Sequence, residues 1–192
     1  MTRMLVWLAL AALPAAAGAG EWQVDTKATD NQVQYTSEVV THAFSGTTDQ
    51  VDGFVYWPGQ NLFAGGDSLR FEVDLRTLDS GIGKRDRDMR DVLATDRWPK
   101  AIFAGHIAGN EPMDSTVTAY RVTAAGTLSF HGVERPVELP GTLVVGPDDS
   151  TVRTSFTLLL KDYNIEAPSL AAFIKVSQEI GVSAFVHLKH VR

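Results

Sequence analysis

Five histidines and one block of alternating charges are the side chains of this chain best suited to acid–base or metal chemistry. The histidines are scattered, and none lies in the spacing typical of a zinc hydrolase. A metal site would therefore need distant residues to meet in the fold. The simpler interpretation is that each histidine either has a structural role or is exposed to solvent. The five are His42, His106, His131, His187 and His190.

The charged block runs from Lys84 to Asp91 and allows two interpretations. One is an acid–base pair beside an arginine clamp for an anion. The other is a short amphipathic helix whose charges of alternating sign face solvent and pair with one another, which is the more common case. Without any catalysis, Arg85 and Arg90 could still bind a ligand head group, and His42 is a third candidate contact.

Motifs of nucleophilic and nucleotide chemistry are absent from the sequence. It contains no Gly-x-Ser-x-Gly elbow and no glycine-rich phosphate loop. It also lacks cysteine, so thiolate catalysis, cysteine metal sites and disulfides are excluded. We therefore expect a protein that is not an enzyme and that has no catalytic residues, bound metal or cofactor.

The first 19 residues have the composition of a secretory signal peptide. A positive charge at Arg3 precedes an apolar run from Leu5 to Leu13, and small residues suited to cleavage follow up to Ala19. The run is shorter than the roughly 20 residues of a membrane-spanning helix, so no stable membrane insertion is expected. Residues 20–192 should then form a single exported domain. The net charge of -6 argues against nucleic acid as a partner.

Past residue 20, apolar and polar residues alternate with the period of half-buried antiparallel strands. From Ser68 to Arg76, four apolar side chains would face one side and the charged side chains the other. Many such segments, separated by turn residues, predict an all-β barrel or sandwich. Two segments break the alternation: Lys84–Ala94, which favours a short helix with an Asp86–Arg90 pair, and Ala167–Phe173, expected to be a loop or one helical turn.

Several motifs occur in the order and spacing of one bacterial family. They are Asp79-Ser80-Gly81, Arg85-Asp86, Met89-Arg90, Trp98-Pro99 and the stretch Gly126–Val137. Together they resemble the YceI-like family of lipocalin-like, polyisoprenoid-binding periplasmic proteins. The resemblance implies an extended eight-stranded antiparallel barrel with one short helix and an apolar cavity. It also implies a periplasmic carrier that binds an isoprenoid lipid, either a polyprenyl phosphate or a quinone tail, for transport or storage, with a homodimer possible.

The large apolar residues on the expected inner faces, and on the helix and loops that could cap them, are the candidate cavity lining. They are Phe44, Phe54, Phe71, Met89, Leu93, Phe103, Leu128, Phe130, Phe156 and Phe173. Two alternatives remain open at this point. One is a lipid- or quinone-modifying enzyme in which His42, His131 and Asp86 converge, and the other is a packed, ligand-free interaction module.

Overall fold

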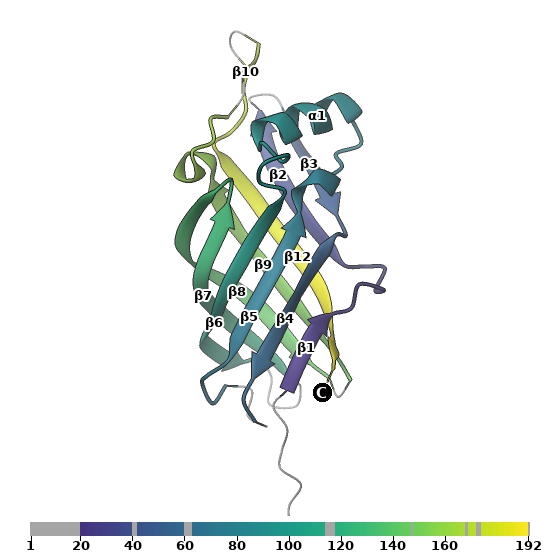
Figure 1. Ribbon diagram of the computed structural model, residues 1–192, viewed down its shortest axis with the longest axis vertical. Coiled ribbons are helices and arrows are strands. Elements are labelled where there is room, and N and C mark those ends of the chain that lie inside the picture. The colour runs from purple at the N-terminus through teal and green to yellow at the C-terminus, as the bar shows by residue number, and fades with distance from the viewer. Residues whose placement is uncertain are drawn as a thin grey trace, which may run out of the picture.

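The computed structural model describes residues 20–39, 42–59, 63–113, 118–146, 148–167, 169–171 and 174–191. Strands dominate this part of the chain, with one α-helix and two 3-10 helices (Figure 1). The elements in chain order are β1 Gly20–Val24, β2 Gln32–Val39, β3 His42–Thr48, β4 Val51–Trp57, β5 Ser68–Asp74, η1 Leu75–Thr77, α1 Gly83–Val92, β6 Lys100–Pro112, β7 Ala119–Phe130, β8 Val133–Val145, β9 Asp149–Leu159, η2 Leu160–Tyr163, β10 Ser169–Ala171, β11 Ile174–Lys175 and β12 Glu179–His190.

Eight antiparallel strands close into a barrel. The hydrogen-bonded order is β1-β4-β5-β6-β7-β8-β9-β12, and β12 pairs back onto β1 to complete the ring. The expected eight-stranded antiparallel barrel is thereby confirmed. An eight-stranded barrel has an interior about wide enough for side chains alone or for one small ligand, so the inward residues decide between a packed and a hollow interior.

The β7–β8 hairpin shows how local sequence sets the register. His131 and Gly132 form its two-residue turn, and both have positive φ, at 51° and 74°. This turn geometry matches the right-handed twist of the flanking strands, which is why it joins hairpins. The turn expected at His131-Gly132 is confirmed.

The first strand position of the barrel is divided into two pieces. β12 pairs with β2 through Gly181–Phe185 and with β1 near its C-terminal end, so β1 and β2 lie one after the other along the same edge. The buried Asn31 side chain bridges the interruption. Its Nδ2 donates to the Asp25 carbonyl at 2.8 Å, and its Oδ1 accepts from the His187 amide at 2.8 Å.

Helix α1 lies across one end of the barrel, and β1 begins at the opposite end (Figure 1). At the α1 end, β3 has no ladder with β5, because β5 ends at Asp74 and the chain turns into η1. A single bridge between Thr47 and Asp79, and a 2.6 Å hydrogen bond between the Thr48 and Thr77 hydroxyls, join β3 to this connection instead. The wall of the barrel is therefore partly non-strand beneath α1.

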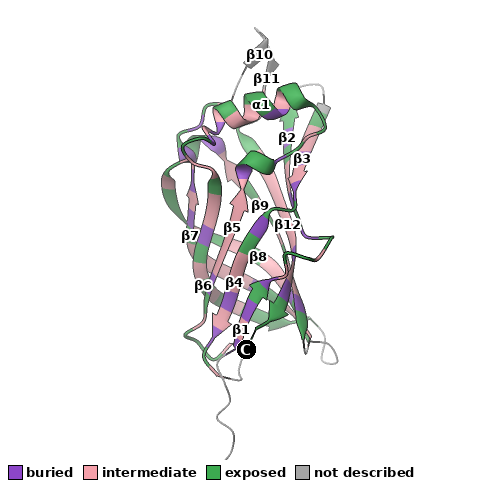
Figure 2. Ribbon diagram, turned by 45° about the vertical axis from the view of Figure 1, so that its right-hand side comes forward, coloured by how far each residue is buried: buried purple, intermediate pink, exposed green. Residues whose placement is uncertain are grey.

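The alternation expected for β5 is present. Leu69 is buried, and Phe71 and Val73 face the same interior, whereas Arg70 and Glu72 form an ion pair with each other on the outside. Along the strands, buried and exposed segments alternate in the same way (Figure 2). The period of two thus carries the inside–outside pattern of the whole barrel.

Two local expectations are wrong. Ser169–Ala171 and Ile174–Lys175 form a two-stranded hairpin, where a loop or helical turn was expected. The expected Asp86–Arg90 ion pair does not form: Asp86 accepts hydrogen bonds from Ser80, and Arg90 donates to the Arg76 carbonyl at 3.3 Å. The predicted helix itself is present as α1, and its i,i+4 ion pair is Lys84–Asp88 at 2.6 Å. The spacing of four residues along the helix allows either Asp86–Arg90 or Lys84–Asp88 as an ion pair. Asp86 is buried and accepts hydrogen bonds from Ser80 instead, so the pair that forms is Lys84–Asp88.

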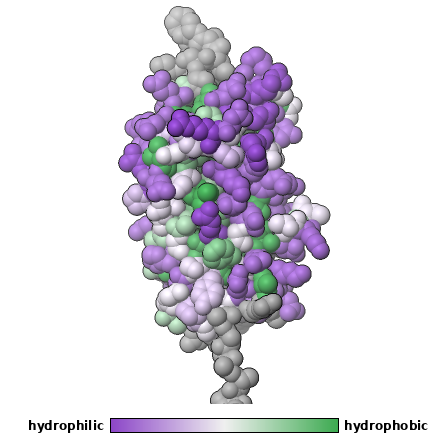
Figure 3. All heavy atoms as spheres, in the orientation of Figure 1, coloured by the Kyte–Doolittle hydropathy of each residue, from purple (hydrophilic) through white to green (hydrophobic). Residues whose placement is uncertain are grey.

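The outer surface is mixed in character. Hydrophilic side chains cover much of the face seen in Figure 3, around smaller apolar areas. Within the described residues, the helices are all too short or too polar to cross a membrane.

Candidate functional site: an apolar cavity inside the barrel

The barrel encloses a cavity of about 560 Å³. This volume lies within the range of about 300–1,000 Å³ that is usual for small-molecule sites. Every strand of the closed barrel except β1 contributes lining residues, and α1 covers one end. The cavity is thus a property of the whole closed sheet.

Small residues on the inner face explain why the barrel is hollow. Ala101, Ala124, Gly141 and Ala184 come from four different strands, and all of them line the cavity. Larger side chains at these positions would fill much of the interior. The apolar inner surface left exposed in this space would be buried by an apolar occupant, which would therefore stabilise the fold.

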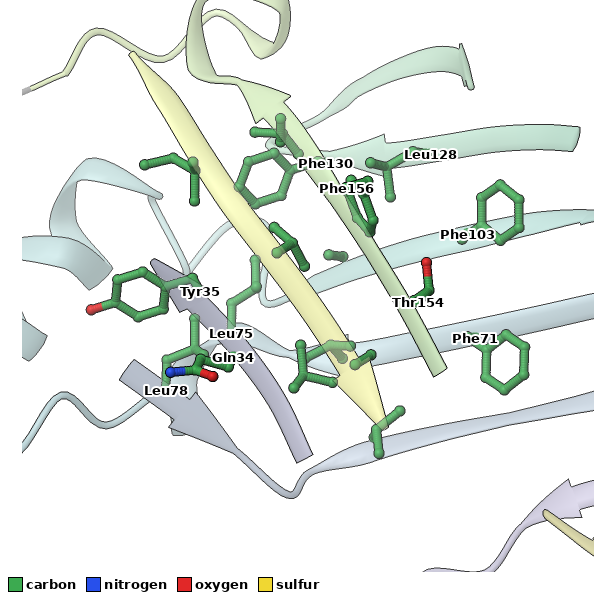
Figure 4. A pocket seen from close by; sticks show the side chains of 18 of the residues that line it. Gln34, Tyr35, Phe71, Leu75, Leu78, Phe103, Leu128, Phe130, Thr154 and Phe156 are labelled. Atoms are coloured by element: carbon green, nitrogen blue, oxygen red, sulfur yellow. The ribbon is translucent and has the colours of Figure 1, made fainter. Parts of the chain in front are cut away.

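Aromatic rings form much of the wall. Phe103, Phe130 and Phe156 come from β6, β7 and β9, and Figure 4 shows their side chains among those that surround the same space. Thr154 is a polar exception on this wall, but its hydroxyl is satisfied by the Pro140 carbonyl at 2.7 Å. The wall at this level therefore offers contact area without free polar groups.

Eight of the ten residues predicted to line the cavity do line it. They are Phe44, Phe71, Met89, Leu93, Phe103, Leu128, Phe130 and Phe156. Phe54 is not among the lining residues: it alternates with the buried Val55 on β4 and so lies on the opposite face. Counting in steps of two from Val51 would have placed it there. Phe173 lies outside the described residues.

The charged lining residues all belong to the α1 end. Among the described residues, Lys84, Arg85 and Asp88 are the charged side chains that line the cavity. Lys84 and Asp88 form an exposed ion pair with each other. The cavity therefore has an apolar body and one polar end.

Arg85 is held at this polar end by Ser80. The Arg85 Nε donates to the Ser80 hydroxyl at 2.8 Å, and Nη2 donates to the Ser80 carbonyl at 2.8 Å. The Ser80 amide donates to Asp86 at 3.0 Å, and the Ser80 hydroxyl donates to the same carboxylate. Ser80 thus joins one cation to one anion.

The Asp86 carboxyl is 6% exposed and nevertheless ionised at neutral pH. Burial by itself raises the pKa of Asp86, but the hydrogen bonds from Ser80 and the charge of Arg90 outweigh it and hold the pKa below its ordinary value of 3.8. The Asp86 carboxylate accepts both bonds near the start of α1 and so ties the helix to the loop that precedes it.

The other two predicted head-group contacts are Arg90 and His42. Arg90 does not line the main cavity and donates to the Arg76 carbonyl instead. His42 begins β3, where its backbone pairs with Val39, and its side chain lies outside the described part. Of the two predicted contacts whose side chains the structure describes, Arg85 lies at the cavity wall and Arg90 does not.

Of the residues suggested for catalysis, the two whose side chains the structure describes, His131 and Asp86, do not meet in the cavity. His131 lies in the β7–β8 turn, where its Nδ1 is 3.0 Å from the Tyr163 carbonyl and its ring packs against Trp98. Neither His131 nor Asp86 is a lining residue. Within the residues that the structure describes, no three histidine or carboxylate side chains are grouped as metal ligands.

Tyr35 and Ser37 are among the polar residues of the wall that were missed as site residues. Tyr35 and Ser37 lie two apart on β2, so they share the inward face with Val33. The alternation from Val33 was the available signal, because steps of two along the strand put Tyr35 and Ser37 on the face of Val33. Burial raises the pKa of the Tyr35 hydroxyl above its ordinary value of 10.0, so it is a protonated donor at neutral pH.

The chain is similar to known proteins over nearly its whole length. Protein YceI of Escherichia coli O17:K52:H18 is 26% identical over 178 residues, covering 86% of this chain and 88% of that protein. A UPF0312 protein of Vibrio cholerae serotype O1 (strain M66-2) is 24% identical over 192 residues, covering 94% of this chain and 97% of its own length.

Two solved structures share the fold. BcnA of Burkholderia cenocepacia has a TM-score of 0.67 at 17% identity, covering 85% of this chain and 98% of BcnA. A polyisoprenoid binding domain from Saccharophagus degradans, implicated in plant cell wall breakdown, has a TM-score of 0.65 at 18% identity, covering 91% and 99% of the two chains. The model of the YceI-like domain matches residues 22–188, and the chain therefore belongs to the YceI-like family.

Proposed function

We propose that this protein is a periplasmic carrier that holds a long isoprenoid lipid in its barrel cavity, without covalent attachment and without turnover. The observation that carries the proposal is the apolar interior of about 560 Å³, which is hollow because small residues occupy inward positions on several strands. The structural similarity to a polyisoprenoid binding domain supports the same ligand class.

The energetics of such binding need no polar recognition along the tail. A large ligand gains about 0.3 kcal/mol of binding free energy per heavy atom. A prenyl chain with about 30 buried heavy atoms would therefore bind with on the order of 9 kcal/mol. That corresponds to a dissociation constant below about 1 μM. An apolar wall alone is therefore sufficient for a lipid carrier.

The two alternatives have less support. A packed interaction module requires a filled barrel, whereas this one contains a cavity. An enzyme requires reactive groups at the ligand, whereas neither His131 nor Asp86 is a lining residue and the Asp86 carboxylate is already taken up by hydrogen bonds from Ser80. The periplasmic location rests on the signal-peptide composition of residues 1–19, which leaves residues 20–192 as the exported domain.

Native mass spectrometry of the protein purified from the periplasm without detergent tests the proposal. We expect a mass increase of one lipid per chain, and organic extraction should then release an unmodified prenyl compound. The same spectrum reports whether the protein is a homodimer, and the N-terminal mass gives the cleavage site. An empty protein that takes up neither quinones nor polyprenyl phosphates, or one that releases a chemically altered lipid, would contradict the carrier function.

A further inference from the structure

Two buried hydroxyls at the α1 end of the cavity have no hydrogen-bond partner among the described residues. They are the Tyr35 Oη and the Ser37 Oγ, and both residues line the cavity. Ser37 is 2% exposed. A buried polar group without a partner is destabilising, and the large majority of such groups in native proteins are satisfied. These two hydroxyls therefore indicate a ligand that supplies acceptors.

The Tyr35 hydroxyl is directed away from the aromatic body of the cavity. Figure 4 shows its oxygen pointing away from the phenylalanine rings. The Tyr35 ring lies over Gly46 of the neighbouring strand, where any side chain would collide with it. The Ser80 hydroxyl lies near enough to lower the pKa of Tyr35, but it donates to Asp86, accepts from Arg85 and makes no hydrogen bond of normal geometry with Tyr35. The Tyr35 ring is therefore fixed in place, and its hydroxyl has no full hydrogen-bond partner among the described residues.

Arg85 brings a third donor group to the same place through Phe44. Its guanidinium carbon is 4.8 Å from the centre of the Phe44 ring. The Tyr35 ring meets Phe44 edge-on, with centroids 6.4 Å apart, and Ser37 is the cross-strand partner of Phe44. Two hydroxyls and a guanidinium thus surround one aromatic ring at the end of an apolar cavity.

The charges around this group are already balanced. Arg85 and Arg90 face the carboxylates of Asp86 and Asp79 around this group, and Lys84 is paired with Asp88. A phosphate or diphosphate needs a surplus of cations, and here it would lie beside a buried carboxylate. An uncharged oxygen acceptor can take hydrogen bonds from the hydroxyls and the guanidinium without that repulsion.

We propose that Tyr35, Ser37 and Arg85 form the subsite for the polar end of the ligand, and that this end is an uncharged group with carbonyl oxygens, as in a prenylated quinone, and not a phosphate. The inference rests on the proposed carrier function and adds the orientation of the lipid. The head group lies beneath α1, and the tail extends along the wall that contains Phe130 and Phe156.

Three probes of equal chain length test the subsite on the delipidated, full mature protein: a prenylated benzoquinone, a polyprenyl phosphate, and the hydrocarbon chain without a head group. Affinities are measured by titration for wild type, Tyr35→Phe and Ser37→Ala. Each variant should weaken quinone binding roughly two- to tenfold, the contribution of one hydrogen bond, and leave hydrocarbon binding unchanged. The matched control is Thr36→Val, which removes a hydroxyl from the exposed face of the same strand.

The outcomes separate the subsite from the carrier function. If the hydrocarbon binds but Tyr35→Phe and Ser37→Ala bind the quinone as wild type does, the subsite is wrong and the carrier function stands. If wild type binds the phosphate more tightly than the quinone, the uncharged head group is wrong. If wild type binds none of the three probes, the carrier function itself fails. Thermal melting of the empty Tyr35→Phe protein verifies its fold, and no loss of stability is expected because the deleted hydroxyl has no partner among the described residues.

Discussion

The Arg85 guanidinium lies over the Phe44 ring, with its carbon 4.8 Å from the ring centroid. This contact joins the start of α1 to the inner face of β3, where, among the described strands, β3 pairs with β2 alone. Arg85 also makes two hydrogen bonds to Ser80. One side chain therefore ties the helix, the preceding loop and the barrel wall together.

Arg85→Met should loosen α1 even in the empty protein. The substitution removes both hydrogen bonds to Ser80 and the cation–π contact, so we expect the free energy of unfolding to fall by about 1 to 3 kcal/mol. Urea unfolding measures the loss. Arg85→Lys keeps the charge but lacks the planar fork, and it should recover only part of the stability. A full recovery in Arg85→Lys would show that charge alone matters here.

Filling the cavity should weaken lipid binding by about tenfold or more without unfolding the barrel. Ala124→Phe places a ring in the cavity, and displacing only two methylene-sized groups of a ligand lowers the affinity about tenfold. Ala125→Phe is the matched control, because Ala125 is the next residue of β7 and points to the other face. Lipid retention by native mass spectrometry compares the two. Equal retention in both variants would contradict the assignment of the cavity as the lipid site.

Stability should fall on acidification below about pH 4. Three partly or fully buried carboxyls have pKa values below their ordinary values. Hydrogen bonds from Lys100 to Glu72 and from Arg76 to Asp74 lower the first two. In Asp86, burial raises the pKa, but the hydrogen bonds from Ser80 outweigh this effect. A carboxyl whose pKa is lower in the folded state stabilises fully above its unfolded pKa of about 4, and loses that contribution as the pH falls through the folded value.

Urea midpoints between pH 7 and pH 2 check the expected acid dependence. Asp86→Asn should reduce the slope below about pH 4, because an amide side chain does not titrate, and should also lower stability at pH 7 by weakening the bonds from Ser80. A midpoint that rises on acidification would contradict the sign of these pKa shifts.

Asn31 should be important for the divided strand. Asn31→Leu leaves the Asp25 carbonyl and the His187 amide without their side-chain partner, which we expect to cost about 1 to 3 kcal/mol in urea unfolding. The control is Asp30→Ala, which removes an exposed carboxylate that binds the His187 ring at 2.9 Å and should have a smaller effect. Equal losses would argue against a special role for the buried amide.

Gly126 should not tolerate a side chain. It faces Gly105 across the β6–β7 pair, and an added Cβ would overlap the Ala104 carbonyl oxygen. We expect Gly126→Ala to destabilise the protein by about 1 to 3 kcal/mol through a forced backbone shift. Gly109→Ala on the adjacent strand is a suitable control, because its Cβ would make only an ordinary contact with Thr123 at 3.8 Å. Thermal melting of both variants should separate them clearly.

The strand pattern could be predicted because a period of two is a local property. Leu69, Phe71 and Val73 alternate with charged residues, and a shift by one residue would bury those charges, so their facing follows from the chain alone. The two-residue turn at His131-Gly132 is equally local. Phe54 shows the limit, because its bulk suggested an inward position although the alternation of β4 puts it outside.

The cavity and its polar end are not local properties. Residues from seven strands of the closed ring leave the space between them, so the volume depends on how the sheet closes and not on any one segment. The Tyr35 and Ser37 hydroxyls, which have no partner among the described residues, can be recognised as part of a polar site only in the folded protein, where α1 brings Arg85 beside Phe44. The inward and outward faces follow from residue order, whereas hollowness and charge balance follow from contacts between residues far apart in the chain.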